Sequence, residues 1–154
     1  MSFGELARLE RRIDALFRDA QGLGIDLQAE LAKLACILAS GYLEVACEEI
    51  FSAYTEPRSN GSVGRYVNRH LRRLRNVKSE RLLQLVGAFD PERRSEVEEE
   101  IRGRLADSIN SIVANRNLVA HGRDVGLTLV RVKQYYDDAR EAMRHVRAHF
   151  PGRT

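Results

Sequence analysis

The sequence is poor in aromatic residues: it has no tryptophan, and only 6% of its 154 residues are aromatic. A shortage of large rings is more typical of a helical protein than of a β-sandwich. Cysteine is also scarce. Cys36 and Cys47 lie eleven residues apart in one apolar helical run, and such a helix separates them by about 16 Å, which excludes a disulfide between them. We therefore expect two buried free thiols.

Long hydrophobic runs are absent as well. No stretch approaches the roughly 20 apolar residues that a membrane-spanning helix needs. The first residues, Met-Ser-Phe-Gly-Glu-Leu, lack the hydrophobic region of a secretion signal. The sequence thus predicts no membrane contact and a location in the reducing cytoplasm. For a chain of 154 residues, we expect a single helical domain over residues 1–154.

Lysine is the scarcer basic residue: of the 25 Lys and Arg residues, three are lysines and 22 are arginines. The formal net charge of +3 and the pI of about 9.1 permit a polyanionic partner without requiring one. The sequence has no glycine-rich phosphate loop, no Ser/His/Asp pattern and no Cys-x-x-Cys pair. Kinases, serine hydrolases and thiol redox enzymes therefore have no support.

Apolar residues that recur every three or four positions predict an all-α fold. The pattern indicates helices at about residues 4–21, 26–54, 65–76, 79–88, 91–121 and 128–150. Asp90 and Thr128 are expected to cap the last two of these helices. Residues 55–64 are rich in turn formers and predict a flexible loop. The expected architecture is a bundle of about four to six helices.

The most informative segment is the string Arg116-Asn117-Leu118-Val119-Ala120-His121-Gly122, near the end of the helix predicted from residue 91. Histidine can move a proton in either direction near neutral pH, and arginine grips phosphate oxygens with a planar fork of donors. These groups can cleave a phosphodiester without a metal, and they point to RNA because its 2′-hydroxyl supplies an internal nucleophile. All four histidines follow an arginine by five positions, so only the full string, which occurs once, is informative.

The spacing of this motif raises a geometric problem. On a regular helix Asn117 and His121 share a side, whereas Arg116 and His121 diverge by about 140°. One helix therefore cannot easily bring all three groups to one phosphate. A bent helix end at Gly122, the long reach of Arg116 or a second copy of the segment from another chain would each solve the problem, and two-fold symmetry is the commonest in soluble oligomers.

The string Arg-Asn-x-x-Ala-His-Gly resembles the signature of HEPN-superfamily ribonucleases, and the stretch from Leu38 to Glu44 resembles the second helix of the RiboL-PSP-like HEPN group. The resemblance implies a HEPN-like helical bundle and a homodimer whose two motifs form one composite active site. It further implies a metal-independent endoribonuclease that needs no cofactor and acts on RNA as a toxin or defence effector, a class that often has an antitoxin protein as partner.

In the implied mechanism, His121 takes the proton from the RNA 2′-hydroxyl or gives one to the leaving 5′-oxygen, which leaves a 2′,3′-cyclic phosphate. Arg116 stabilises the negative charge of the transition state, and Asn117 orients the histidine or a phosphate oxygen. A position near a helix C-terminus favours imidazolium and hence the acid role. The structural alternative is that Asn117 and His121 cap the helix end while Arg116 pairs with an acid.

Glu44 interrupts an otherwise apolar helix. It is a candidate for orienting His121 or pairing with Arg116, and the alternative is a solvated strip shared with Glu48. Positive charge is densest in residues 65–81. Basic residues that bind successive phosphates of RNA are expected to share one face of a helix. The candidates for RNA binding are Arg65, Arg69, Arg72, Arg73 and Lys78. A solvated helix paired with the acidic residues 96–100 explains this segment equally well.

His145 and His149 have the four-residue spacing of metal ligands, but no third ligand accompanies them. We therefore expect no metal site and exposed imidazoles near the chain end.

HEPN toxins controlled by nucleotidylation often carry a tyrosine two residues after the histidine, where this chain has Arg123. Control by that modification is accordingly not expected here. Two rival functions stay open: a non-catalytic HEPN-like module that binds RNA, a nucleotide or a partner helix, and a basic RNA-binding adaptor that works through residues 65–81 with His121 incidental.

Overall fold

The computed structural model describes residues 4–152, and within this range it contains seven α-helices, one short 3-10 helix and no strand. The predicted all-α fold is confirmed. The elements are α1 (Glu5–Ala20), α2 (Ile25–Thr55), η1 (Glu56–Arg58), α3 (Gly61–Arg72), α4 (Ser79–Phe89), α5 (Pro91–Ile101), α6 (Arg104–Ala120) and α7 (Leu129–His149).

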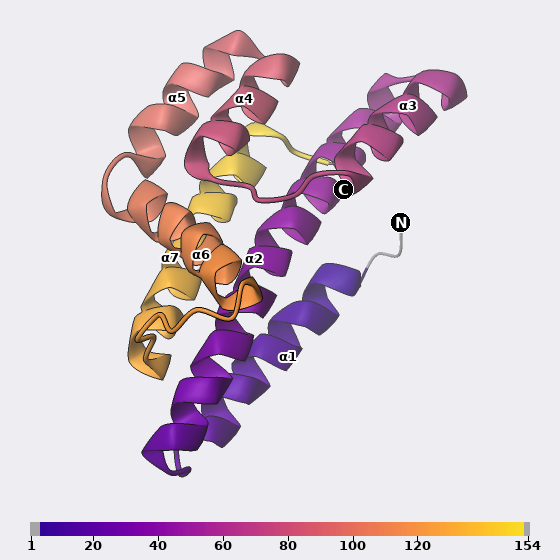
Figure 1. Ribbon diagram of the computed structural model, residues 1–154. Coiled ribbons are helices and arrows are strands. Elements are labelled where there is room, and N and C mark those ends of the chain that lie inside the picture. The colour runs from indigo at the N-terminus through magenta and orange to yellow at the C-terminus, as the bar shows by residue number, and fades with distance from the viewer. Residues whose placement is uncertain (1–3, 153–154) are drawn as a thin grey trace.

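The helix count exceeds the predicted four to six because the long helix expected from residue 91 is divided. α5 ends at Ile101, Arg102 has an extended ψ of 137°, and Gly103 takes a φ of 85° before α6 begins. Glycine reaches this φ readily, whereas other residues do not. Figure 1 shows the chain changing direction between α5 and α6. A single internal glycine thus converts one predicted helix into two.

The segment predicted as a flexible loop, residues 55–64, is largely helical, so that prediction is wrong about its secondary structure. α2 continues to Thr55, η1 covers Glu56–Arg58, and only Ser59 and Asn60 separate it from α3. Asn60 caps α3, because its side-chain oxygen accepts a hydrogen bond from the backbone N–H of Val63 at 3.0 Å. Turn-forming residues here act as a helix cap.

α2 is the central element, and it contacts α1, α3, α6 and α7. Figure 1 shows α1 on one side of α2 and α6 and α7 on the other. Its buried side chains include both cysteines, whose predicted burial as free thiols is confirmed. Burial raises the pKa of Cys36 to about 11 and that of Cys47 to about 12, so both thiols stay protonated and unreactive at neutral pH. No helix in residues 4–152 has the length and apolar character to cross a membrane.

Side-chain caps begin α5 and α7, the helices before and after the motif helix α6 in the chain. Asp90 accepts from the N–H of Glu92 at 3.0 Å and Thr128 accepts from the N–H of Arg131 at 3.2 Å, as predicted. A third contact was not foreseen: the N–H of Ser79, at the start of α4, donates to Asn110 Oδ1 on α6 at 2.9 Å. This bond joins the N-terminus of α4 to α6, the helix that carries the Arg-Asn…His-Gly string.

Candidate active site at the end of α6

The glycine of the His-Gly pair terminates α6. Gly122 has a φ of 69°, and its N–H donates to the Val119 carbonyl at 2.9 Å while the Arg123 N–H reaches back to the Leu118 carbonyl at 3.0 Å. These two bonds form a Schellman motif, which satisfies the last carbonyls of a helix. The backbone N–H of His121 also bonds within this turn. The helix end is therefore closed by backbone groups, and the imidazole is not needed for capping.

The three motif side chains differ in their surroundings. Arg116 and Asn117 are half-buried, and an Nη1 of Arg116 donates to Asn117 Oδ1 at 3.3 Å. His121 is exposed, and its imidazole has neither a hydrogen bond nor an ion pair with any residue in the range 4–152. The structure thus brings the guanidinium and the amide together within one chain and leaves the imidazole outside that pair.

Glu44 on α2 lies near charged and polar groups of α6 and of the connection between α3 and α4. Its carboxylate is 3.8 Å from Nε of Arg75. This arginine, the positive charge of Arg116 and a hydrogen bond from the backbone N–H of Asn76 each lower the pKa of Glu44. Burial nevertheless raises the pKa of Glu44 above its usual value, because desolvation outweighs these three favourable contributions. Glu44 and Glu48 line one hollow with Arg72 and Arg75, so Glu44 pairs with the basic segment, and Arg116 acts on it through its charge without an ion pair.

The basic segment forms an open hollow along α3. Four arginines and one asparagine line it, with a volume of about 300 Å³: Arg65, Asn68, Arg69, Arg72 and Arg73. Lys78, the fifth predicted RNA-binding residue, stands apart from this set, at the N-cap of α4. In the described part of the chain, Arg72 pairs with Glu48 at 3.5 Å, while Arg65, Arg69 and Arg73 have no carboxylate within ion-pair distance. Most of the positive charge in the hollow is thus free to meet an external anion.

Comparison with known protein families identifies the family of this chain. The family model described as RiboL-PSP-HEPN matches residues 5–150. The chain belongs to the RiboL-PSP-HEPN family. No curated protein and no solved structure matches the chain. Family membership supports a nuclease or another RNA-related function.

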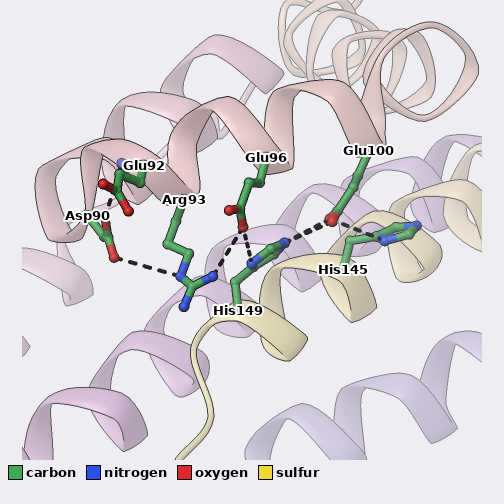
Figure 2. Close-up of polar contacts among 7 residues, drawn as sticks. All are labelled: Asp90, Glu92, Arg93, Glu96, Glu100, His145 and His149. Atoms are coloured by element: carbon green, nitrogen blue, oxygen red, sulfur yellow. Dashed lines mark hydrogen bonds and ion pairs between the residues drawn. The ribbon is translucent and has the colours of Figure 1, made fainter.

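The alternative explanation for the basic segment of this RiboL-PSP-HEPN chain was that it pairs with the acidic residues 96–100. The structure does not show this pairing among the described residues. Figure 2 shows Glu96 and Glu100 of α5 facing His145 and His149 of α7 instead. His149 Nε2 lies 2.9 Å from a Glu100 oxygen, and its Nδ1 lies 3.2 Å from Glu96. Glu96 and Glu100 therefore take part in the contact between α5 and α7, and they do not neutralise the arginines of α3.

The predicted exposure of the two histidines is wrong for His149, whose side chain is only 13% exposed because it is held between two carboxylates. His145 is 40% exposed and lies 3.4 Å from Glu100. Across residues 4–152, no group of three or more His, Cys, Asp or Glu side chains is placed to hold a metal ion. These histidines bind α7 to α5 through imidazole–carboxylate contacts.

Two further polar groups of the RiboL-PSP-HEPN fold were missed from sequence. Asp138 on α7 is 2% exposed and accepts hydrogen bonds from Ser108 and Arg104 of α6. Tyr66 and His70, one turn apart on α3, are exposed beside the arginines. The sequence contained a signal for Tyr66 and His70 only, because an aromatic residue among arginines is typical of nucleic-acid-binding surfaces. Nothing in the sequence marks Asp138, since buried and exposed acids look alike without their partners.

Proposed function

We propose that this protein is a metal-independent endoribonuclease. The observation that carries the proposal is the single Arg-Asn-x-x-Ala-His-Gly string of a RiboL-PSP-HEPN family member, with its imidazole exposed and free of internal partners. A histidine used for structure would be expected to hydrogen-bond its own fold, as His149 does. His121 is instead available to a ligand.

The proposed reaction is attack of an RNA 2′-oxygen on the adjacent phosphorus, with rupture of the bond from phosphorus to the 5′-oxygen. His121 accepts the proton of the 2′-hydroxyl or supplies one to the leaving 5′-oxygen. Arg116 stabilises the extra charge on the phosphorane-like transition state, and Asn117, which accepts from Arg116, orients the guanidinium. The products are a 2′,3′-cyclic phosphate and a 5′-hydroxyl.

A homodimer with a composite site completes the proposal, because the imidazole lies outside the Arg116–Asn117 pair of its own chain. Exposed apolar side chains on α2 support this proposal, since Leu27, Leu34 and Ile37 are 51%, 38% and 39% exposed. Helical geometry places these three side chains within about 80° of one another. Leu118, inside the motif itself, is 41% exposed. Covering this apolar surface with a second copy would favour association.

Substrate RNA is proposed to follow the arginines of α3 towards the motif. Arg72 and Arg75 extend the positive charge from α3 to α2, where they pair with Glu48 and Glu44, and the charge of Arg116 also acts on Glu44. We further propose that the protein is a cytoplasmic toxin or defence effector with an antitoxin protein as partner. Arg123, at the position of the modified tyrosine in some HEPN toxins, argues against control by nucleotidylation there.

The first experiment measures cleavage of single-stranded RNA by the wild-type protein and by His121→Ala in the presence of EDTA. We expect cleavage with EDTA, cyclic-phosphate ends by mass spectrometry, and a loss of about 10²–10⁴-fold on substitution, as for a general acid or base. His145→Ala is the matched control, since that histidine faces Glu100 instead. Abolition of cleavage by EDTA would refute the chemistry.

The second experiment tests the composite site by mixing two inactive variants. Arg116→Ala and His121→Ala homodimers each lack one group, whereas their heterodimer holds one intact guanidinium and one intact imidazole on different chains. We expect mixing to restore cleavage and each variant alone to stay inactive. A monomer by molar mass in solution, with full activity, would contradict the dimer.

The rival function is a non-catalytic RNA-binding module, and the arginine-lined hollow on α3 favours it because its lining excludes Arg116 and His121. Under this alternative, pure protein binds RNA without cutting it, and His121→Ala changes neither binding nor any effect on cell growth.

A further inference from the structure

A second hollow shares α3 with the arginine-lined one and lies on the face of α3 that meets α4. It has a volume of about 400 Å³ and is formed between α3 and α4. Its apolar lining includes Val67, Leu71, Leu74, Leu85 and Phe89. Tyr66, His70, Arg81 and Gln84 supply its polar groups. An apolar hollow with a few polar groups at this scale is typical of a site for a small ring system.

Tyr66 is the unusual residue of this hollow, because a large aromatic side chain is 65% exposed there. It is not loose: its hydroxyl lies 3.0 Å from His70 Nε2, and the two rings meet edge to face with centroids 4.8 Å apart and planes at 84°. The contact with His70 thus orients the Tyr66 ring, while most of the side chain stays exposed. An exposed, oriented aromatic ring beside a cavity is a platform on which a flat ligand can stack.

The charge around the hollow identifies the class of ligand. Arg81 lines the hollow, and helical geometry places Arg69 and Arg73 within about 60° of Tyr66 around α3. In the described residues none of the three has a carboxylate within ion-pair distance. The acid nearest to them in sequence, Glu80, is taken by Arg94 at 2.9 Å. A partner must therefore bring negative charge at several points together with a flat apolar group.

We propose that the hollow between α3 and α4 binds an unpaired base of single-stranded RNA, stacked on Tyr66, while the free arginines of α3 and Arg81 hold the flanking phosphates. The inference rests on the proposed RNA-related function and specifies its substrate as single-stranded, because a base inside a duplex is not free to enter the hollow. A peptide partner would have to match the same charges with closely spaced acids, so RNA fits the combination of ring and phosphates better.

The test is RNA binding by fluorescence anisotropy in the His121→Ala background, which separates binding from cleavage. Tyr66→Ala is expected to weaken binding of a single-stranded oligoribonucleotide about tenfold, the effect of losing one stacked base. Tyr66→Phe keeps the ring and should bind within twofold of the parent. Because Tyr66 is largely exposed, both variants should keep the parental Tm, which excludes misfolding as the cause.

Two ligands sharpen the result. An oligomer with the same sugar–phosphate backbone but no bases, and a blunt duplex of the same sequence, should each bind Tyr66→Ala and its parent equally. Equal affinity of Tyr66→Ala and parent for the single strand, or an equal loss for the abasic oligomer, would overturn the proposal and leave the hollow to a protein partner. Binding that depends on Tyr66 in a protein that cleaves nothing would refute the nuclease but not this site. RNA cleavage by a protein whose RNA binding does not depend on Tyr66 would refute this site but not the nuclease.

Discussion

At its N-terminal end α6 gives Arg104 and Ser108 to a buried polar cluster around Asp138, whereas at its C-terminal end it presents Arg116, Asn117 and His121. Asp138 is 2% exposed, and it accepts from Arg104, from Ser108 Oγ at 2.5 Å and from Gln134 at 3.0 Å. A buried carboxylate is tolerated only when hydrogen bonds replace its hydration. Here every required partner is internal.

The other end of the helix lacks such internal partners. Within the described residues the His121 imidazole has none, and Arg116 donates only to Asn117, next to it in the chain. The difference teaches that similar residue types on one helix serve stability where the fold completes their hydrogen bonds. Where the fold leaves those bonds open, they are available for a ligand. Variants at each end should therefore separate activity from stability.

The largest expected effect is on activity at the C-terminal end. Arg116→Ala should lower kcat/KM for RNA about 10²–10³-fold, because it removes a donor to the charge that develops in the transition state. The Tm should stay close to that of the wild type, since the guanidinium bonds only to Asn117. Steady-state kinetics and thermal unfolding check both parts, with Arg123→Ala, an exposed arginine just beyond the helix, as control. A large fall in Tm would place Arg116 with the structural residues.

The mirror prediction concerns Asp138. Asp138→Ala should lower the free energy of unfolding by about 3 kcal/mol, because Ser108 is buried and loses its partner. Chemical denaturation measures the change, and cleavage below the transition temperature should persist. Glu141→Ala is the matched control, because it removes only an exposed contact of Arg104 at 2.9 Å. A loss of activity without loss of stability would reverse the assignment of the two ends.

A smaller effect is expected where the motif helix ends. Gly122→Ala should destabilise the fold by about 1–2 kcal/mol, the cost of a left-handed conformation with a Cβ. No atom lies within 4 Å of the added Cβ, so the cost is conformational and not steric. Gly41→Ala is a control of opposite sign: its Cβ is equally uncrowded, but it lies inside α2, where alanine is favoured. Equal Tm values for both variants would contradict this account of Gly122.

The smallest effect concerns Glu44. Because its pKa in the folded state is raised, the folded state binds more protons than the unfolded state, and wild-type stability falls as pH rises through that pKa. Glu44→Gln removes this loss, so its Tm should slightly exceed that of the wild type at pH 7, with the difference shrinking as pH falls below the pKa. Glu48→Gln, which removes only the contact with Arg72, should not raise Tm. A Tm advantage that grows towards acid pH would have the wrong sign.

Much of the fold followed from local pattern. The helical periodicity of α1, α2 and α7 is strong because each buries one or more sides against the same core, and the caps at Asp90 and Thr128 act within three residues of their own positions. The break at Gly103 was missed because glycine is tolerated inside helices and the apolar repeat continues across it. The candidate site could be proposed from sequence because its residues lie within one string.

Residues distant in sequence were the ones that needed the structure. Glu44 comes near the charges of Arg75 and Arg116 only after α2 packs against α6 and the connection between α3 and α4, and His149 meets Glu100 only after α5 packs against α7. The sequence supplied the charges but not their distances. For that reason His149 was predicted to be exposed, and Asp138 could not be distinguished from a surface acid.

The amino-acid sequence by itself determined the helices and the motif that ends α6, because hydrogen bonds and periodicity within a helix depend on near neighbours. Tertiary structure alone decided which charged groups are satisfied and which stay open, because that depends on side chains from different helices and on the burial that makes an unpaired charge costly. By this division Asp138 and His149 are held internally, whereas the imidazole of His121 and the largely exposed ring of Tyr66 remain open to a ligand.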